Sequence, residues 1–543
     1  MTFARVGTIG ACAVCATVVS YAQIGKIVQQ DWVTGRGDAQ RTSWIRGDAA
    51  ISTESMQKPG FTLQWKATLD NQPRQLNALN AGVVIGNLGF GSIPLSFITG
   101  SANRVFAVDN DTGALFWQRT FDSGGGRAET LECPGGITSA ATRPASAVPT
   151  IPGPARGPQT RPAYTSGVGA PGEGVPAYLM GRGRAAAAPG PAAAARGPAP
   201  PQTPPPAPPP AVVYALSSDG QLHTLGLYTG KDVARPLTFL PPNARASDLI
   251  ALNNIVYTTT MRGCSGVADG VWALDLTRDG NAVKTWKTDG GSPTGPPAFR
   301  SDGTLVVAIG ARAASGAGGY ANAMVALNPQ DLTVTDWFTQ PDVDFVTPPA
   351  ILKVADREVV AAAARDGSIV LLDATSLGGP THDALVARSA TVTGERSGFV
   401  PTGLSTWVDS SGTSWVLMPT ATAVAAMKIS ISNGTPTIAS GWVSRQMRAP
   451  LSPVIVNGVA FVVSSGEFVP PAGASVNAAD RARRSVPAVL YALDALTGRE
   501  LWSSGTTIAT FARGSATWPG IGQIHVATYD NTVYAFGFPV ERY

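Results

Sequence analysis

The chain has 543 residues, a charged fraction of 14% and a formal net charge of +4. This balance excludes the strongly basic surface on which nucleic-acid binding depends, so we expect no nucleic-acid partner. With 61 glycines and 44 prolines, the composition favours strands and turns over helices.

Residues 1–22 have the pattern of a secretory signal peptide. A mostly apolar stretch follows Arg5, and it is too short to span a bilayer comfortably. Small residues before Gln23 predict cleavage at that position. The alternative is a lipoprotein signal that carries its lipid on Cys12, although the apolar run before this cysteine is short. No later stretch resembles a transmembrane segment, so we expect a periplasmic or secreted bacterial protein.

The mature chain repeats one pattern, which is a short apolar strand ending in Asp, then a turn, then often a tryptophan. The clearest copies are residues 105–109 and 490–494. Weaker copies centre on His223, Trp272, Val325, Val370, Ala425 and Tyr534. From His223 onward the spacing is about 43 to 66 residues, which suits the four short antiparallel strands of a propeller blade. Asp-Gly and Asn-Gly pairs beside these strands predict tight hairpin turns.

Three regions follow the predicted signal peptide. Residues 23–142 are predicted to hold an N-terminal closing segment and the first blade. Residues 143–211 are dominated by Pro, Ala and Gly and predict a disordered insertion, because such a segment buries too little apolar surface to fold. Residues 212–543 hold the remaining blades, with an exposed loop insertion at 468–487. The last copy lacks an outer strand, and the stretch from Phe61 to Lys66 supplies one, which predicts a ring closed by both ends of the chain.

The two clearest copies share the complete motif Ala-x-Asp-x-x-Thr-Gly-x-x-x-Trp, at Ala107 to Trp117 and at Ala492 to Trp502. This motif resembles the tryptophan-docking motif of the quinoprotein alcohol dehydrogenase-like propellers, which carry pyrroloquinoline-quinone (PQQ) repeats. The resemblance implies an all-β, eight-bladed propeller of four-stranded antiparallel blades, with seven blades as the alternative. The predicted docking residues are Trp65, Trp117, Trp286, Trp337, Trp442 and Trp502. The units at His223 and Val370 lack such a tryptophan.

Removal of the signal peptide leaves two cysteines, Cys133 and Cys264, both in loop-like sequence. In an oxidising compartment such a pair predicts one disulfide. Neither cysteine has a Cys or His neighbour at ligand spacing, so a metal site is not expected.

The resemblance also raises the hypothesis of a PQQ-dependent dehydrogenase, in which a Trp and two adjacent cysteines sandwich the quinone and calcium polarises it. The mature chain has no adjacent cysteine pair, no calcium-ligand pattern that we can match and no Cys-x-x-Cys-His haem motif. Its histidines are His223, His382 and His525. They belong to different units, and His223 occupies a strand position typical of a core residue. A Ser-His-Asp arrangement stays open, but no nucleophile elbow stands out.

The repeated aspartates Asp109, Asp275, Asp373 and Asp494 occupy equivalent blade positions, which predicts that they shape turns. We therefore assign no catalytic or metal-binding residue and predict no cofactor. The sequence favours a binding or scaffold propeller that holds protein partners through its blade loops or its proline-rich insertion. The alternative is a PQQ- and calcium-dependent dehydrogenase that oxidises alcohols or sugars. Two Arg-Gly-Asp tripeptides, at Arg36 and Arg46, are not expected to act as adhesion motifs.

Overall fold

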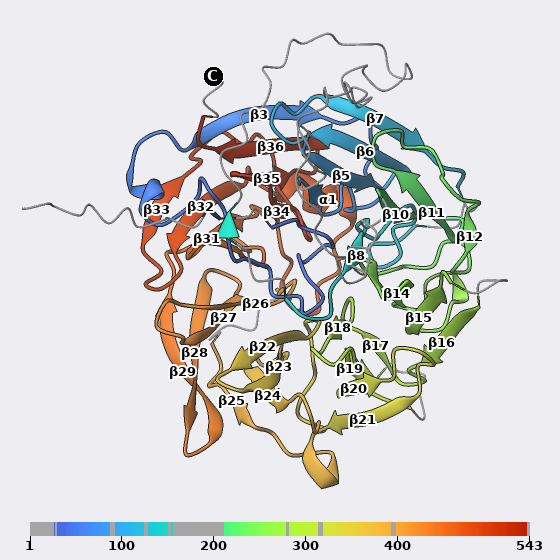
Figure 1. Ribbon diagram of the computed structural model, residues 1–543, viewed down its shortest axis with the longest axis vertical. Helices are drawn as coiled ribbons and strands as arrows, with labels where there is room; N and C mark the ends of the chain where they lie inside the picture. Colours follow the sequence, from blue (N-terminus) through green and yellow to red (C-terminus); the bar gives the residue numbers. More distant parts are fainter. Residues whose placement is uncertain are drawn as a thin grey trace, which may run out of the picture.

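The computed structural model describes residues 30–86, 93–123, 129–149, 211–277, 282–312, 319–392 and 398–539, with two short strands at 26–27 and 154–155. These residues form an eight-bladed β-propeller, in which small antiparallel sheets are arranged around a central channel (Figure 1). The predicted signal peptide, with the alternative lipid site at Cys12, lies outside the described residues, as does most of the proline-rich insertion.

The blades follow one another around the ring in chain order. Blade 1 contains β4 (Val83–Ile85), β5 (Leu95–Gly100), β6 (Arg104–Asp109) and β7 (Leu115–Thr120), and blade 2 contains β10 (Val212–Leu216), β11 (Gln221–Gly226) and β12 (Leu237–Thr238). Blade 3 contains β13 (Ile250–Leu252), β14 (Ile255–Thr260), β15 (Gly270–Asp275) and β16 (Val283–Lys287). Blade 4 contains β17 (Gly291–Pro293), β18 (Ala298–Phe299), β19 (Leu305–Arg312), β20 (Ala323–Leu327) and β21 (Val334–Thr339). In blade 2 the innermost position is reduced to an isolated bridge between Thr142 and Tyr214. The chain between Thr142 and β10, which holds the proline-rich stretch, therefore connects two parts of blade 2.

Blades 5 to 8 complete the ring. Blade 5 contains β22 (Ala350–Val354), β23 (Arg357–Ala363), β24 (Ile369–Asp373) and β25 (Ala387–Arg388), and blade 6 contains β26 (Ser405–Val408), β27 (Ser414–Pro419), β28 (Val424–Ser432) and β29 (Thr435–Val443). Blade 7 contains β30 (Val454–Val456), β31 (Val459–Ser464), β32 (Val489–Asp494) and β33 (Glu500–Ser503). Blade 8 contains β34 (Thr517–Pro519), β35 (Gln523–Ala527), β36 (Thr532–Gly537) and β3 (Thr62–Thr68). Two short strands extend blades: β2 (Trp44–Ile45) pairs with β30, and β8 (Pro144–Ala145) pairs with β13. Two others, β1 (Lys26–Ile27) and β9 (Pro154–Ala155), form a separate two-stranded sheet.

Blade 8 contains both ends of the described ring, as the sequence predicts. Strand β3 pairs antiparallel with β36, from Thr62 opposite Gly537 to Thr68 opposite Thr532. This pairing covers the free edge of β36, so the ring closes with eight blades, and the seven-bladed alternative is wrong. The hairpin turns also form as expected: Asn457 and Gly458, between β30 and β31, both have positive φ values, 44° and 79°, which suit a tight hairpin.

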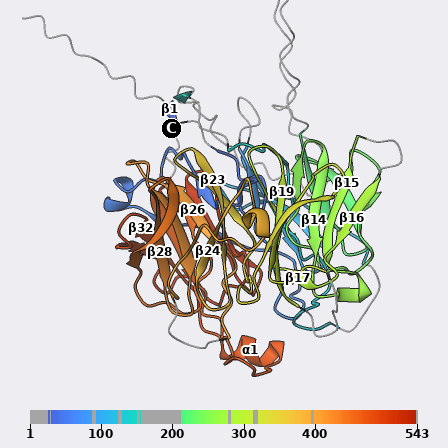
Figure 2. The ribbon, with the colours of Figure 1, turned by 90° about the horizontal axis from the view of Figure 1, so that it is seen from below.

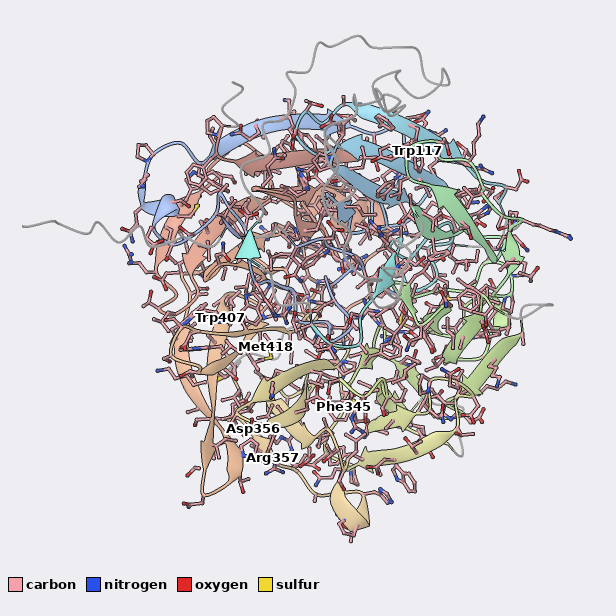
Figure 3. All side chains as sticks on the ribbon, in the orientation of Figure 1. Trp117, Phe345, Asp356, Arg357, Trp407 and Met418 are labelled. Atoms are coloured by element: carbon pink, nitrogen blue, oxygen red, sulfur yellow. A yellow bond between two sulfur atoms is a disulfide. The ribbon has the colours of Figure 1, made fainter. Side chains whose placement is uncertain are left out.

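The apolar core lies between neighbouring blades. Every residue of β5 and of β31 is buried, because a central strand is covered on both faces by the adjacent blades. The outermost strands alternate instead: in β7 Trp117 is buried while its neighbours Phe116 and Gln118 are not. Figure 3 shows Trp117 at the rim of the ring, whereas Phe345 lies further inside.

The two faces of the ring carry different features. The connection from the second to the third strand of blade 7 contains the predicted loop at 468–487, and it forms a short helix, α1 (Ala478–Arg484), with no buried residue. Helix α1 projects from one face, and β1 lies beyond the opposite face (Figure 2). No helix in the described part of the chain is long and apolar enough to cross a membrane.

Candidate functional site in the central channel

The channel is occupied by residues 31–50, which we call the axial segment. It precedes the first blade in sequence and runs inside the ring of blades (Figure 1). Hydrogen bonds join it to all eight blades in chain order, through Val84, Thr142, Leu249, Phe299, Ile351, Thr406, Ile455 and Gly522. One segment of chain therefore contacts every blade from the inside.

Two arginines of the axial segment, Arg36 and Arg41, are buried in the channel, with exposed fractions of 6% and 0%. Arg36 donates from Nη1 to the Ser43 hydroxyl (3.1 Å) and from Nη2 to the Ser452 hydroxyl (2.9 Å). Arg41 donates from Nε to the carbonyl of Pro297 (2.9 Å) and from Nη1 to the Thr34 hydroxyl (2.7 Å). The Nη2 of Arg41 is buried without a hydrogen-bond partner. Both guanidinium groups are thus held mainly by uncharged acceptors.

Burial lowers the pKa of both arginines to about 10, and Asp248 offsets part of that effect. Their mutual repulsion lowers the pKa of Arg41 further. Both side chains remain charged at neutral pH. The only other nearby carboxylate that raises the pKa of Arg41 is Asp38, which pairs with Arg46 at 3.3 Å. The channel therefore holds more buried positive charge than its close ion pairs neutralise.

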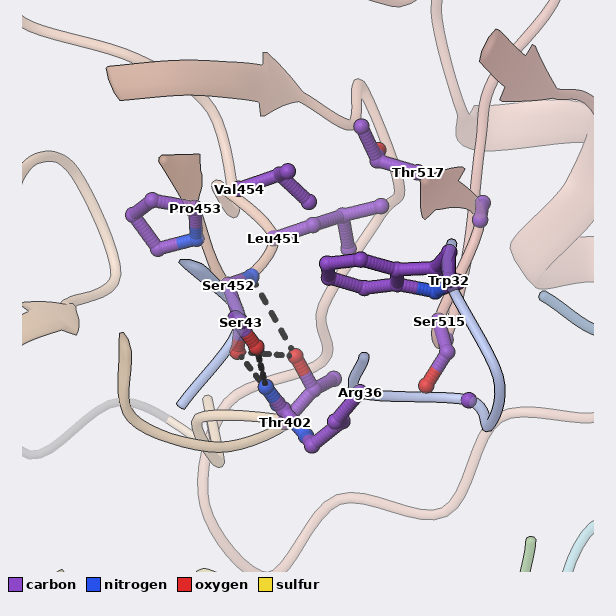
Figure 4. Close-up of a pocket in the computed structure, with 13 residues that line it drawn as sticks. Trp32, Arg36, Ser43, Thr402, Leu451, Ser452, Pro453, Val454, Ser515 and Thr517 are labelled. Atoms are coloured by element: carbon purple, nitrogen blue, oxygen red, sulfur yellow. Dashed lines mark hydrogen bonds between the residues drawn. The ribbon is translucent and has the colours of Figure 1, made fainter. Parts of the chain in front are cut away.

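A small pocket lies beside Arg36 (Figure 4). Its lining includes the Trp32 indole, the Arg36 guanidinium and the side chains of Ser43, Thr402, Ser452 and Thr517. The cavity volume is about 20 Å³, which is enough for about one water molecule. The Trp32 Nε1 and the Thr517 Oγ1 are buried without a hydrogen-bond partner. The pocket is small, polar and rich in donors.

The histidines do not meet. His223 lies in β11 and contacts Ser217 (Oγ to Nε2, 3.2 Å) and Asp232 (Oδ1 to Nδ1, 3.1 Å). These three residues have the hydrogen-bond order of a Ser-His-Asp triad. However, Ser217 is only 2% exposed, and its hydroxyl also donates to Asp219. Phe121 stacks on the imidazole at 4.0 Å. Burial lowers the pKa of His223, and Asp232 partly offsets this. The arrangement ties together the strands of blade 2 and leaves no approach to the hydroxyl.

The other two histidines also pack between blades. His382 stacks on Trp337 with centroids 3.7 Å apart. His525 is 0% exposed and lies between Trp65 (5.2 Å) and Trp518 (5.5 Å). Burial lowers the pKa of His525 to about 3, so its ring is neutral at pH 7. It faces neither solvent nor an open funnel.

Three of the predicted docking tryptophans make the same contact with the next blade. The indole Nε1 of Trp65 donates to Asn110 O (2.9 Å), that of Trp117 to Leu227 O (2.8 Å), and that of Trp442 to Ala495 O (3.0 Å). Each ring covers a glycine with positive φ, namely Gly113, Gly230 and Gly498, where an added Cβ would approach the ring to 2.4–2.6 Å. Only glycine fits beneath the ring at these turns.

The remaining three predicted tryptophans reach the next blade through aromatic contacts. Trp286 lies 5.4 Å from Tyr320, Trp337 stacks on His382, and Trp502 lies 4.9 Å from Phe61 by ring centroids. The outer strands β12 and β25, in the units of His223 and Val370, have no tryptophan. Six of the eight blade interfaces thus carry an aromatic contact at the rim.

The repeated aspartates shape the turns next to these contacts. The Oδ1 of Asp109 accepts from the amides of Asp111 and Thr112, and the Oδ1 of Asp494 accepts from those of Leu496 and Thr497. Asp275 and Asp373 do the same for Thr277 and Thr375. The four carboxylates lie in separate blades and form no cluster.

The predicted disulfide is present between Cys133 and Cys264, whose Cα atoms lie 5.5 Å apart. Cys133 lies in the connection from blade 1 to blade 2, and Cys264 lies between β14 and β15 of blade 3. The bridge therefore ties blade 3 to the chain that enters blade 2, on the same face as α1.

Sequence reasoning gave Arg36 and Arg41 no role. In the sequence Arg36 only begins an Arg-Gly-Asp tripeptide, but its burial removes it from any adhesive role. Asp48, which ends the second tripeptide, is 3% exposed and accepts hydrogen bonds from the amides of Ala50 and Gly522. No spacing in the sequence signals these positions, because they are defined by eight blades meeting at the axis.

The fold is similar to that of solved alcohol and methanol dehydrogenases. A europium-containing methanol dehydrogenase matches with a TM-score of 0.55 and 10% identity, over 94% of this chain and 98% of its own. Quinohemoprotein alcohol dehydrogenases from Comamonas testosteroni and from Pseudomonas putida HK5 each match with a TM-score of 0.53, at 14% and 12% identity, over 94% of this chain and 80% of theirs. At these identities the likeness shows the fold alone. No family model and no curated protein sequence matches the chain.

The pocket beside Arg36 does not fit PQQ. Ligand pockets usually enclose about 300–1,000 Å³, whereas the pocket beside Arg36 encloses about 20 Å³. The described residues contain no group of three or more His, Cys, Asp or Glu side chains able to hold a metal ion.

Proposed function

We propose that this chain is an exported binding or scaffold propeller that holds protein partners through its blade loops. The observation that carries the proposal is the axial segment, whose hydrogen bonds run to all eight blades and fill the channel. In a propeller enzyme of this fold the channel has to admit a cofactor and a substrate. A filled channel instead makes the ring a rigid platform.

The face that carries α1 supports this proposal. The helix begins with an N-cap, in which the Asn477 side chain accepts from the Asp480 amide at 2.8 Å. Its base is held by Arg481, which pairs with Glu467 at 2.6 Å, and Glu467 also binds Arg513 at 2.9 Å. Arg483 points outward, with 77% of its side chain exposed. A short helix that is fixed at its base and has no buried residue suits contact with a protein partner.

Reconstitution tests the proposal against the dehydrogenase alternative. Mature protein is titrated with PQQ and calcium by calorimetry, and dye reduction is then assayed on alcohols and sugars. We expect no saturable heat at high micromolar cofactor and no substrate-dependent dye reduction. Stoichiometric binding with dye reduction would contradict the proposal and make the chain a quinoprotein dehydrogenase.

Photo-crosslinking in the native host tests the partner surface. A photoreactive residue at Arg483 on α1 is compared with one at Asp356, an exposed residue in the turn between β22 and β23 on the opposite face (Figure 3). We expect one discrete, reproducible adduct from position 483 and none from position 356. Equal, diffuse labelling from both positions would show that α1 is not the partner surface.

A further inference from the structure

The polar pocket beside Arg36 has an imbalance of hydrogen-bond donors that the described residues do not satisfy. The Ser43 hydroxyl accepts from Arg36 but donates to no described acceptor. The Trp32 Nε1 and the Thr517 Oγ1 have no partner at all. These residues are 2%, 1% and 7% exposed. A buried donor that is left unmet destabilises the fold, so three around one small cavity indicate a missing acceptor.

The other hydroxyls of the pocket are already committed. The Ser452 Oγ donates to Gly403 O (2.8 Å) and accepts from Arg36, and it lies 2.8 Å from the Thr402 Oγ1. Because Ser452 has used its proton, Thr402 donates to Ser452. Neither hydroxyl has a proton left to donate to a ligand in the pocket, and no carboxylate lines the pocket to offset the charge of Arg36.

The buried arginines, like the unmet hydrogen-bond donors, indicate that a negatively charged partner is missing. Arg36 and Arg41 form no close ion pair with a carboxylate of the described residues, and both are attracted by the same Asp248. Asp38 is paired with Arg46. Arg36 is therefore a buried charge with no carboxylate of the described residues at ion-pair distance. A buried charge of this kind is costly unless it is paired.

We propose that the pocket binds one small monovalent anion, of the size of a halide ion, held by Arg36, Ser43, Trp32 and Thr517. The cavity of about 20 Å³ excludes larger organic anions. These residues belong to the axial segment and to blade 8, and Ser452 and Thr402 belong to the entries of blades 7 and 6. The anion therefore fastens the axial segment to the part of the ring where the chain closes. The proposal is independent of whether the propeller is a scaffold or an enzyme.

Chloride and bromide are the probes. Thermal unfolding of the full mature protein is followed at constant ionic strength while sulfate is replaced by chloride or bromide. A ligand that binds only the folded state raises the unfolding midpoint with its concentration. We expect a saturable rise for the unmodified protein and a loss of that rise in Thr517→Val and Ser43→Ala, which remove one free donor each and leave Arg36 in place.

Thr288→Val is the matched control, because Thr288 is equally buried, at 2% exposed, and its hydroxyl bonds to Asp269 O far from the pocket in sequence and in the ring. It is expected to keep the full anion response. General salt effects change all four proteins equally, so an equal response in all of them would overturn the proposal.

A crystal grown in bromide gives the direct readout. We expect one internal anomalous peak within hydrogen-bond distance of the Arg36 guanidinium, weakened in Thr517→Val. Only surface peaks in the unmodified protein, or none, would overturn the site even if the midpoint moved.

Discussion

The rim and the axis of this propeller are stabilised in different ways. At the rim the same contact recurs, with a tryptophan of one blade covering a glycine turn of the next, as for Trp65 on Gly113 and Trp442 on Gly498. At the axis no contact recurs, because one segment meets eight blades at eight different residues. Repeated contacts make the rim modular, whereas the contacts at the axis all depend on the one axial segment.

Removal of a docking tryptophan should have the largest effect. Trp117→Ala removes the ring between blades 1 and 2, and a buried Trp→Ala change costs about 3–5 kcal/mol. Trp117→Phe is the control, since it keeps a ring on Gly230 and loses mainly the bond to Leu227 O, worth about 1 kcal/mol. Urea unfolding measures both variants. Equal losses would show that the hydrogen bond, and not the ring, holds the blades together.

The disulfide should contribute next. Cys133 and Cys264 enclose a long loop, with a sequence separation of 131, and loss of such a bridge costs about 2–5 kcal/mol. We expect the double Ser variant to unfold at lower urea with blade contacts otherwise intact. A midpoint unchanged within error would mean that the bridge adds nothing to the contacts on that face.

His525, buried beside both Trp65 and Trp518, connects stability to pH. Its pKa of about 3 in the folded state lies below the ordinary value of about 6.5, so the unfolded state takes up a proton first. This contribution is complete above pH 6.5 and is lost as pH falls from about 6.5 toward 3, by about 1.4 kcal/mol per pH unit. Unfolding of His525→Phe should therefore depend less steeply on pH in this window. Parallel pH profiles for the two proteins would contradict the assignment.

A single methyl group at the rim should have the smallest effect. In Gly498→Ala the new Cβ would lie 2.5 Å from Trp442 at a φ of +74°, which combines backbone strain with displacement of the ring. We expect a loss of about 1–3 kcal/mol. Gly412→Ala has a similar φ of +84° with nothing within 4 Å, so it isolates the backbone part. The difference between the two variants measures the docking contact.

The rim was predictable from the sequence and the axis was not. Asp-x-x-Thr-Gly-x-x-x-Trp encodes a local turn and the ring that covers the next one, so Trp117 and Trp502 identify blades without any knowledge of their neighbours. Ring closure by β3 and β36 also followed, because an incomplete unit at each end needs the other. The roles of Arg36 and Arg41 depend on residues hundreds of positions away, such as Ser452, which no local pattern reports. Ser217, His223 and Asp232 lie close together in sequence, but the strand pairing in blade 2 that brings their side chains into contact is not marked by any motif.

Hydrogen exchange of the axial segment tests the central claim most directly. Residues 31–50 belong to no blade except for β2, and in an open-channel propeller their amides would exchange within seconds. If the segment fills the channel, peptides covering it should be protected as strongly as those from β5 and β31, and far more than the exposed turn at Asn433. Rapid exchange of the segment beside fully protected blades would contradict the account and leave the channel open to a cofactor.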